Sequence, residues 1–311
     1  MKAAQFDKYG GPEVIEIKET AKPAPGKGQV LVEVFASSVN PIDWKVREGY
    51  LKDFSPLNFP VTIGGNFSGV VSEVGEGVTK FKTGDEVYGQ ALVLNGGSGS
   101  MAEFLVSNVD NTSAKPNNIN HTEAASLPLV GVSALQAVVQ HINLQKGQKI
   151  LIQGGAGGIG TIAIQIAKSV GAYIATTVSS KDIEFVKNLG ADEVIDYKKE
   201  KFEEKLSELD GVFDASGAKP SEESLKVLKK GGIFVSMTGQ ADETLAKKYG
   251  VSAIGESADV LKSNLDKLRE LVEKGVVKSQ VDRIYPLEQT REAFEYQEEG
   301  HPRGKVVISV K

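Results

Sequence analysis

Hydrophobic and polar positions follow two different rhythms along this chain. Up to about residue 120, short runs in which apolar and polar residues alternate are separated by glycine and proline, for example at 29–34 and 69–75. A period of two residues is typical of β-strands that bury one face. The first part of the chain is therefore predicted to be mostly β.

Beyond about residue 122, apolar runs alternate with amphipathic segments. Strands are predicted at 150–153, 173–178, 193–197, 212–215 and 233–237, with helical segments between them. This alternation predicts an α/β domain with a parallel sheet covered by helices. The amphipathic segment 257–274 predicts a last long helix, and residues 281–311 are expected to return to β-structure. The pattern does not decide whether a strand at 305–310 joins the second sheet or the first domain.

A glycine-rich turn joins the strand at 150–153 to the helix that follows it. Gly155, Gly157 and Gly160 fit the spacing G-x-G-x-x-G. In this motif the first glycine permits a tight turn, the second lets backbone amides approach a pyrophosphate, and the third lets helix and strand pack closely. A flexible turn would not need the strand and the amphipathic helix on its two sides, so the context predicts a dinucleotide site. The candidate residues of the turn are Gly155, Ala156, Gly157, Gly158, Ile159 and Gly160.

The motif is not a P-loop. Thr161 follows Gly160 directly, so the Lys-Ser/Thr pair that a P-loop needs is absent. Simple NTPases are therefore excluded.

The end of the second predicted strand of this domain indicates which dinucleotide binds. NAD enzymes place an acid about 20 residues after the glycine turn to bind the ribose hydroxyls. Here the chain reads Thr-Thr-Val-Ser-Ser-Lys at 176–181, with no carboxylate before Asp182. Hydroxyl and ammonium groups suit a 2′-phosphate, so NADPH is the predicted cofactor, with contacts from Thr177, Ser179, Ser180 and Lys181. Ser179 with Asp182 also fits a helix capping box, which explains the serines equally well but not the missing acid.

Composition narrows the partners. A chain of 311 residues suggests two domains. The 36 basic and 41 acidic residues give a net charge of −5, which argues against a nucleic-acid partner. An apolar run long enough to span a bilayer and a signal-peptide core are both missing, so a cytoplasmic protein without a membrane partner is expected.

The metal-binding residue types are scarce. Zero cysteines exclude disulfides, thiolate zinc sites and a cysteine nucleophile. The three histidines, His121, His141 and His301, are too far apart in sequence to match any metal-ligand spacing. No bound metal is predicted.

Six segments together carry a family resemblance. They are residues 2–19 with Gly-Gly-Pro-Glu at 10–13, Asn-Pro-Ile-Asp-Trp-Lys at 40–45, residues 64–75, Leu-Pro-Leu-Val-Gly-Val-Ser-Ala at 127–134, the glycine turn, and Gly-His-Pro-Arg-Gly-Lys-Val-Val at 300–307. The chain resembles the medium-chain dehydrogenase/reductase superfamily, in its zinc-independent NADPH:quinone oxidoreductase family. The resemblance implies a GroES-like, mostly β catalytic domain at 1–122, a Rossmann doubly wound parallel sheet at 123–280, and a tail at 281–311 that returns to the first domain. It also implies a homodimer that partly pairs the edges of the Rossmann sheets.

The resemblance also supplies candidate catalytic residues. Where zinc alcohol dehydrogenases of the same superfamily have a cysteine ligand, this chain has Asn40, and Gly-Gly-Asn at 64–66 replaces their Gly-His-Glu. Hydrogen-bond donors and the cofactor ribose must then polarise the substrate carbonyl. By resemblance Asn40, Asp43, Lys45 and Tyr50 lie near the interdomain cleft, with Lys45 able to stabilise an oxyanion. In the alternative interpretation Asn40 and Asp43 form turns before a helix, and Lys45 is solvated.

Further cofactor contacts are expected at the carboxyl ends of later strands. Gly217, Thr238 and Gly239 follow predicted strands at the edge where open α/β sheets bind ligands, although glycines there also serve ordinary turns. By resemblance Tyr197 lies near the 2′-phosphate and Arg303 reaches the cofactor.

The predicted function is NADPH-dependent, zinc-independent reduction of quinones or α,β-unsaturated carbonyls. One alternative is an enone or alkenal double-bond reductase on the same scaffold. Another is a non-catalytic NADPH-binding protein, a sensor or a crystallin-like protein. The physiological substrate does not follow from the sequence.

Overall fold

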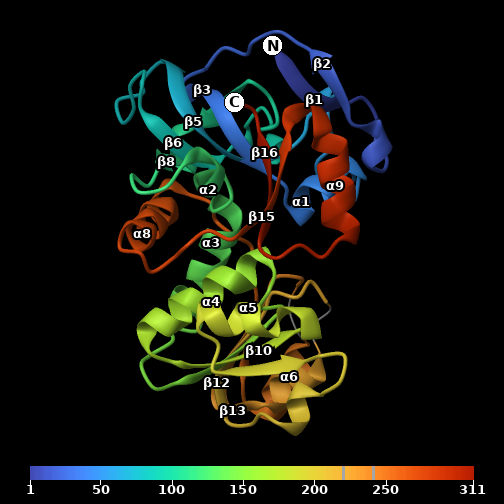
Figure 1. Cartoon of the computed structure of the whole chain (residues 1–311), viewed down its shortest axis with the longest axis vertical. Helices are drawn as coiled ribbons and strands as arrows, with labels where there is room; N and C mark the ends of the chain where they lie inside the picture. The colour runs from blue at the N-terminus through green and yellow to red at the C-terminus, as the bar shows by residue number, and fades with distance from the viewer. Residues whose placement is uncertain (219–220, 240–241) are drawn as a thin grey trace. The chain divides into compact units, whose positions relative to one another are not determined.

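The computed structural model describes residues 1–218, 221–239 and 242–311, and the chain forms two compact units. The β unit comprises residues 1–129, 260–273 and 279–311, and the α/β unit comprises residues 130–259 and 274–278. In Figure 1 the β unit therefore carries the blue and the red ends of the colour scale.

The α/β unit contains a six-stranded parallel sheet in the order β11-β10-β9-β12-β13-β14. The strand order reverses between β9 and β12, which is the arrangement of a Rossmann fold. The strands are β9 (Lys149–Gln153), β10 (Tyr173–Val178), β11 (Glu193–Asp196), β12 (Leu209–Asp214), β13 (Leu228–Ser236) and β14 (Ser252–Gly255). The five predicted strands are present. Strand β14 is a sixth that the sequence pattern did not reveal, since its four residues include a single large apolar one.

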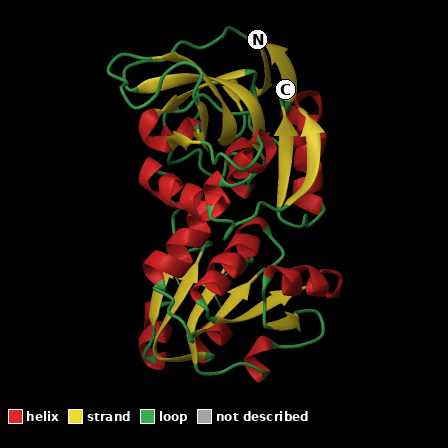
Figure 2. Ribbon diagram, turned by 60° about the vertical axis from the view of Figure 1, so that its left-hand side comes forward, coloured by secondary structure: helices red, strands yellow, loops and turns green. Residues whose placement is uncertain are grey.

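Helices pack against this sheet, as Figure 2 shows for the red helices beside the yellow strands. The helices that contact the sheet are α4 (Gly158–Val170), α5 (Ile183–Leu189), α6 (Glu222–Lys226), α7 (Glu243–Tyr249) and a π-helical turn (Gln136–His141), and α3 (Pro128–Leu135) precedes that turn. The central strands are apolar on both faces, and Leu151, Ala175, Val212 and Phe234 belong to one buried cluster. Burial on both faces is typical of a parallel sheet covered by helices.

The β unit is built from two sheets, which confirms the prediction of a mostly β, GroES-like part. A three-stranded sheet has the order β2-β1-β4, and the larger sheet has the order β15-β16-β3-β5-β6-β8, with β7 also paired to β3. Their bounds are β1 (Lys2–Phe6), β2 (Glu16–Glu19), β3 (Gln29–Ser38), β4 (Val61–Thr62), β5 (Asn66–Val74), β6 (Glu86–Gln90), β7 (Phe104–Asn108), β8 (Thr112–Ala114), β15 (Val281–Pro286) and β16 (Lys305–Ser309). Along β3 the alternating residues Val30, Val32 and Val34 are buried in one cluster, as expected from the period of two.

Helices and short 3-10 turns complete this unit. In addition to a helix in the tail of the chain, described below, the helices are α1 (Pro41–Arg47), α2 (His121–Ala125) and α8 (Lys262–Glu273). The helix α8, which was expected within a second domain ending at 280, belongs to the β unit. Its Leu265 and Leu268 are fully buried, and the hydroxyl of Tyr88 donates to the Leu265 carbonyl at 2.7 Å. The 3-10 turns in the described parts of both units are at Pro12–Val14, Val93–Asn95, Val109–Asn111, Ser180–Asp182, Phe202–Glu204 and Leu287–Gln289.

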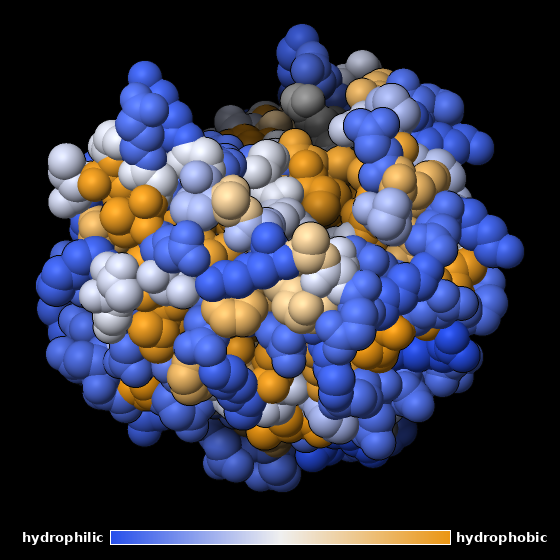
Figure 3. Space-filling model, turned by 90° about the horizontal axis from the view of Figure 1, so that it is seen from above, coloured by the Kyte–Doolittle hydropathy of each residue, from blue (hydrophilic) through white to orange (hydrophobic). Residues whose placement is uncertain are grey.

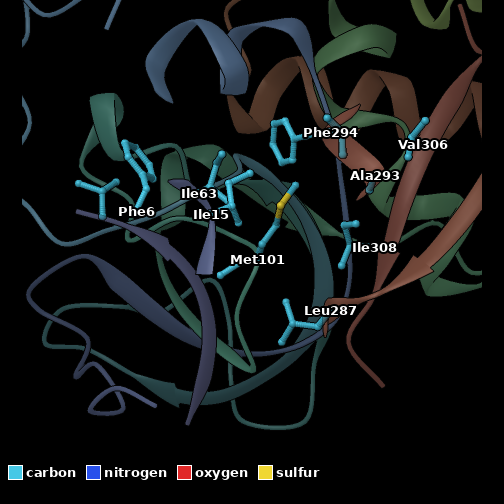
Figure 4. Close-up of a cluster of buried hydrophobic side chains, with 12 residues drawn as sticks. Phe6, Ile15, Ile63, Met101, Leu287, Ala293, Phe294, Val306 and Ile308 are labelled. Carbon is cyan, nitrogen blue, oxygen red and sulfur yellow. The ribbon is translucent and has the colours of Figure 1, made fainter. Parts of the chain in front are cut away.

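The tail of the chain returns to the β unit, where β16 pairs with β15 and β3. The expectation of β-structure throughout 281–311 was wrong in one place, because a helix, α9 (Thr290–Glu299), lies between β15 and β16. Only Ala293 and Phe294 of this helix are fully buried. Two adjacent apolar residues do not show the repeat of three and four residues that identifies a helix in the sequence. They pack in a cluster with Phe6, Met101 and Ile308 (Figure 4).

The described segments contain no helix long and apolar enough to cross a membrane. The face seen in Figure 3 is mainly hydrophilic, with apolar areas between the charged side chains.

Candidate functional site

The glycine turn between β9 and α4 is shaped by its own packing at two positions. A Cβ atom on Gly155 would lie 2.1 Å from Thr176 Oγ1, and one on Gly160 would lie 2.3 Å from the carbonyl oxygen of Gly154. Both distances are far below van der Waals contact. These two glycines are therefore required by the fold itself.

Gly157 differs from them. A Cβ there would meet its nearest neighbour, the Gly154 carbonyl oxygen, at 3.5 Å, and its backbone has an ordinary φ of −77°. The protein alone does not require glycine at this position. Gly157 is also the N-cap of the 13-residue helix α4, without a side-chain cap, so amides of the first turn are available to an anion. The turn fits a dinucleotide pyrophosphate.

Thr177, predicted to contact the cofactor ribose, supports the glycine turn. Its Oγ1 accepts a hydrogen bond from the Gly154 amide at 3.2 Å, and the residue is only 7% exposed. The backbone carbonyl of Thr177 accepts the Gly155 amide at 3.1 Å. The end of β10 and the turn thus form one hydrogen-bonded unit.

The serines beyond β10 are engaged by carboxylates. Ser179 Oγ donates to Asp182 at 2.7 Å, and Ser180 Oγ donates to Asp196. Lys181, which follows Ser180 in the sequence, is exposed. The Ser179–Asp182 bond joins two side chains, and Ser179 makes no side-chain bond to a backbone amide of the turn that follows, so it is not the expected capping box. Lys181 remains an exposed cation of the predicted phosphate site.

Asp196 is a residue of this region that the sequence analysis did not single out. It ends β11 and pairs in register with Val178 of β10. Its carboxylate accepts from Ser180, from the Lys198 amide at 3.1 Å, and is 3.4 Å from the Lys199 ammonium. The Ser180 bond, above all, holds the pKa of Asp196 below its usual range. Its position at the carboxyl end of a predicted strand was the available signal. The next residue, Tyr197, is exposed.

The loops after β12 and β13 show turn chemistry at the same edge of the sheet. The Asp214 carboxylate accepts from the Ser216 amide at 3.0 Å and from the Ser216 hydroxyl at 2.6 Å. The Thr238 hydroxyl donates to the Ala218 carbonyl. Gly217 and Gly239 have φ values of +82° and +124°, a region that favours glycine. Both glycines are explained by the turns, and their contact with a cofactor stays a prediction.

Glu256, directly after β14, is a buried carboxyl at that edge. It is 8% exposed, and both of its carboxyl oxygens lack a hydrogen-bond partner within the described chain. Burial, with a smaller contribution from Asp259, raises the pKa of Glu256 to about 8. This carboxyl is therefore largely protonated at neutral pH.

In the β unit, Asn40 and Asp43 form a buried cluster with Lys305, a lysine that is distant in the sequence. Lys305 Nζ donates to Asn40 Oδ1 at 2.7 Å and also to the Val39 carbonyl. The Asn40 amide N–H donates to Asp43 Oδ2 at 2.7 Å, while Asp43 Oδ1 has no partner in the described residues. All three side chains are nearly inaccessible, with 1%, 1% and 6% exposure for Asn40, Asp43 and Lys305. We call these three residues the Asn40 cluster.

Burial dominates the electrostatics of the Asn40 cluster. It raises the pKa of Asp43 to about 7, against the opposing effects of the Asn40 amide and the Lys305 charge. It lowers the pKa of Lys305 to about 8, against the attraction of Asp43. The sequence analysis missed Lys305, although a lysine at the start of the apolar run 305–308 was a visible anomaly.

The other two predicted catalytic residues are accessible. Tyr50 is 66% exposed and packs edge-on against Trp44, with ring centroids 5.8 Å apart. The half-buried Lys45 places its ammonium 5.7 Å from the centre of a Trp44 ring. The four predicted residues thus separate into a buried pair and an accessible pair on one segment. Arg303 is exposed in the loop before β16.

The positions that match the zinc-ligand segments of zinc alcohol dehydrogenases hold Asn40, Gly65 and Asn66 here. Asn66 is fully buried, and its Nδ2 donates to Ser38 Oγ at 3.3 Å. Across the described residues, no group of three or more His, Cys, Asp or Glu side chains is arranged to hold a metal ion.

Two protein-family models match the chain. Residues 26–117 match the alcohol dehydrogenase GroES-like domain, and residues 189–308 match a model described as zinc-binding dehydrogenase. The second description names a metal, but this sequence contains no cysteine.

Curated relatives and solved structures cover almost the whole chain. A chloroplast envelope quinone oxidoreductase homolog of Arabidopsis thaliana is 33% identical over 99% of this chain and 98% of its own length. The NADPH-dependent alkenal/one oxidoreductase of the same plant is 38% identical over 99% of this chain and 79% of its own length. The quinone oxidoreductase structure from Coxiella burnetii has a TM-score of 0.91 at 35% identity and covers 100% of this chain and 99% of its own. The Escherichia coli quinone oxidoreductase complexed with NADPH has a TM-score of 0.88 at 26% identity, with 99% and 100% covered.

Proposed function

Because the chain belongs to the quinone oxidoreductase-like family of the medium-chain dehydrogenase/reductase superfamily and is an NAD(P)H-dependent oxidoreductase, we propose that it uses NADPH to reduce quinones or α,β-unsaturated carbonyls. One observation carries the cofactor part: a Cβ would fit at Gly157, with its nearest neighbour at 3.5 Å, beside uncapped helix amides, whereas the fold leaves no room for a Cβ at Gly155 and Gly160. Space that the protein leaves open at this motif suits a pyrophosphate.

NADPH is favoured over NADH by the residues at the end of β10. Thr177 stands where an acid would bind the ribose hydroxyls, and its hydroxyl is used to hold the turn. Asp196, the nearby carboxylate on β11, is occupied by Ser180 and Lys199. Lys181 then supplies the accessible charge for a 2′-phosphate. A related Escherichia coli structure was determined with NADPH, which supports the same choice.

The substrate class follows from the charge that develops during reduction. Bound NADPH would supply a hydride to an electron-poor carbon and become NADP⁺, while negative charge develops on the conjugated oxygen. A proton then completes the product, on oxygen for a quinone and on the α-carbon for an enone or alkenal. The chain must therefore provide donors for that oxygen. Asn40 and Lys45 are the proposed donors, and the exposed side chains of Tyr50 and Phe54 offer apolar contact to a flat substrate.

Reduction of an enone or alkenal double bond is the second candidate. It is favoured by the 38% identity with an alkenal/one oxidoreductase. The same donors serve both reactions, because the negative charge appears on a conjugated oxygen in each. Family membership favours these two reactions over the non-catalytic alternative. A homodimer, the cytoplasmic location, the catalytic roles of Asn40, Asp43, Lys45 and Tyr50, and the domain boundaries at 122 and 280 stay predictions.

The test is a substrate screen with purified protein and NADPH. We expect NADPH oxidation with 1,4-quinones, 1,2-quinones or enals, and none with saturated aldehydes. For enals, chromatography should identify the saturated aldehyde as the product rather than the allylic alcohol. Turnover of saturated aldehydes alone, or of no acceptor, would contradict the proposal.

A further inference from the structure

The Lys305 ammonium determines which end of the Asn40 carboxamide is available. An ammonium has three donors and no acceptor. At 2.7 Å from Asn40, it can bind only the carboxamide oxygen. The orientation of this amide is thus fixed by chemistry, although oxygen and nitrogen of an amide are otherwise easily exchanged.

The nitrogen of the same carboxamide is underused. Asn40 Nδ2 donates to the Ser38 carbonyl at 3.4 Å, which exceeds the usual range of about 2.7–3.2 Å for an N–H···O bond. A side-chain hydrogen bond from Asn40 is also the smallest of the causes that lower the pKa of Asp43. An amide nitrogen carries two hydrogens, so among the described residues Asn40 keeps a donor that is only weakly engaged.

Asp43 holds the other side of Asn40. It accepts the Asn40 backbone N–H at 2.7 Å and is the anion that opposes the loss of charge on Lys305. Asn40 is therefore fixed at its backbone by a carboxylate and at its side chain by an ammonium. Asn40 and Asp43 also form the capping box at the start of α1, as the alternative interpretation expected. A capping box does not require a buried ammonium, whose desolvation is costly, so Lys305 is not explained by the helix cap.

We propose that Lys305 is a positioning residue that makes Asn40 a hydrogen-bond donor toward the substrate oxygen that becomes negatively charged on hydride transfer. The proposal rests on the function proposed above. It assigns the substrate-directed bond to Asn40 Nδ2, and it gives Lys305 no contact with substrate or cofactor.

The first test compares two buried lysines of the β unit. Lys305→Met removes the ammonium while keeping the chain length, and Lys115→Met is the matched control. Lys115 is 8% exposed and donates to the carbonyls of Pro116 and Ile119, away from Asn40. With the best acceptor from the substrate screen, Lys305→Met should lower kcat at least tenfold and leave the NADPH Kd within twofold of wild type. Lys115→Met should retain kcat. Wild-type kcat in a folded Lys305→Met variant would overturn the proposal.

The second test asks whether Lys305 acts through Asn40. In an Asn40→Ala background, where no carboxamide remains to be oriented, adding Lys305→Met should change kcat by less than twofold. A further tenfold loss there would show that Lys305 acts by another route and would overturn the proposal. Lys305→Arg, which also offers only donors, should recover most of the activity that Lys305→Met loses.

The third variant covers the case in which Lys305→Met fails to fold. Asn40→Asp keeps an oxygen for Lys305 and removes both N–H donors. We expect kcat as low as in Asn40→Ala, with a thermal midpoint no lower than that of Asn40→Ala. Wild-type kcat in either Asn40 variant would overturn the donor role of Asn40. A wild-type protein that reduces no quinone or enone would instead refute the proposed function, so the two failures are distinguishable.

Discussion

The glycine turn of the α/β unit and the Asn40 cluster of the β unit are constructed in opposite ways. The turn is made from consecutive residues between β9 and α4. A ligand can bind there to the backbone amides of the first turn of α4, beside Gly157. The Asn40 cluster joins residues that are 265 positions apart, Asn40 and Lys305, through buried side chains. The comparison teaches that a backbone site is specified locally, whereas a charged side-chain site depends on which distant strands pair.

The two sites also have different weaknesses. A side chain added to the turn acts by steric exclusion, because glycine supplies space. A side chain removed from the Asn40 cluster leaves a buried charge without its partner. We therefore expect changes in the turn to affect ligand binding and changes in the cluster to affect turnover and pH dependence.

The largest effect is expected from Gly157→Val. The branched side chain would occupy the space beside the amides of α4 that the fold leaves open. NADPH affinity should fall by about a hundredfold or more, while the thermal midpoint stays near that of wild type. Fluorescence titration with NADPH and thermal unfolding measure the two quantities. The control is Gly155→Ala, whose Cβ would lie 2.1 Å from Thr176 Oγ1 and should lower the midpoint. Unchanged NADPH affinity in folded Gly157→Val would show that the turn has only a structural role.

Cofactor preference should show the next largest effect. A charge-assisted hydrogen bond to a phosphate contributes about 1.5–3 kcal/mol, so one such contact from Lys181 would favour NADPH over NADH by about ten- to a hundredfold in kcat/KM. Lys181→Ala should reduce this ratio.

Thr177→Asp should reduce the ratio further, because its carboxylate repels the phosphate and offers NADH a ribose partner. It also keeps an acceptor for the Gly154 amide that Thr177 now binds. Equal or better use of NADH by the wild type would refute the NADPH assignment.

Lys45→Ala tests the accessible half of the predicted catalytic residues. If Lys45 stabilises charge on the substrate oxygen, kcat and kcat/KM should fall together by about tenfold, because the interaction forms mainly in the transition state. The NADPH Kd should not change. Lys52→Ala, an exposed lysine of the same segment, serves as the control. Wild-type rates with every accepted substrate would return Lys45 to the role of a solvated lysine stacked on Trp44.

Glu256 in the α/β unit contrasts with Asp43 in the Asn40 cluster. Both carboxyls are buried, but only the pKa of Asp43 is lowered by a nearby cation, Lys305. The folded pKa of Glu256, about 8, exceeds the ordinary value of 4.5. The stability that it contributes is therefore fully present below about pH 4.5 and is lost as the pH rises toward 8, at no more than about 1.4 kcal/mol per pH unit. Glu256→Gln cannot ionise, so its free energy of unfolding should rise relative to wild type between pH 5 and pH 8.

Urea unfolding at pH 5, 6.5 and 8 measures this difference. Glu208→Gln, at an exposed glutamate, should differ from wild type by a constant amount. A constant difference for Glu256→Gln as well would refute the buried, protonated state of Glu256.

The smallest effect, no change at all, is expected from metal removal. The positions matching the zinc ligands hold Asn40 and Gly65, and the chain has no cysteine. Turnover should survive exhaustive dialysis against a chelator. Loss of activity that zinc restores would contradict the zinc-independent assignment.

The sequence predicted those features that are encoded in short segments. The strands from β9 to β13 and the glycine turn follow from apolar runs and spacing, because a buried parallel strand and a tight turn each impose their pattern on a few consecutive residues. The apolar pattern of 305–310 predicted a strand but not the sheet that it joins, because the pattern within a strand does not specify the neighbouring strand. Pairing of Ile308 with Ser37 decides it.

The features that were missed depend on surroundings. Helix α9 has too few buried residues to show its period, and its position is set by packing of Phe294 in a cluster whose other members come from distant segments of the chain. Asp196 and Glu256 look like ordinary acids in the sequence. What distinguishes them is the Ser180 hydroxyl from the turn after β10 for Asp196 and, for Glu256, the lack of a hydrogen-bond partner among the described residues. Burial of this kind is a tertiary property.

The late position of Lys305 has a consequence for synthesis on the ribosome. The last three residues of β3, at 36–38, pair with β16 at 307–309. Residues 130–259 and 274–278 of the α/β unit are translated between these two segments. Residues 38 and 307 are about 270 positions apart, so at about 5–20 residues per second the interval is roughly 13–54 s. During that time the α/β unit can complete its sheet, while β3 keeps an unpaired stretch and Asn40 has no ammonium to orient it. The nascent β unit thus exposes an open strand edge, the kind of surface that other chains can bind, until β16 arrives.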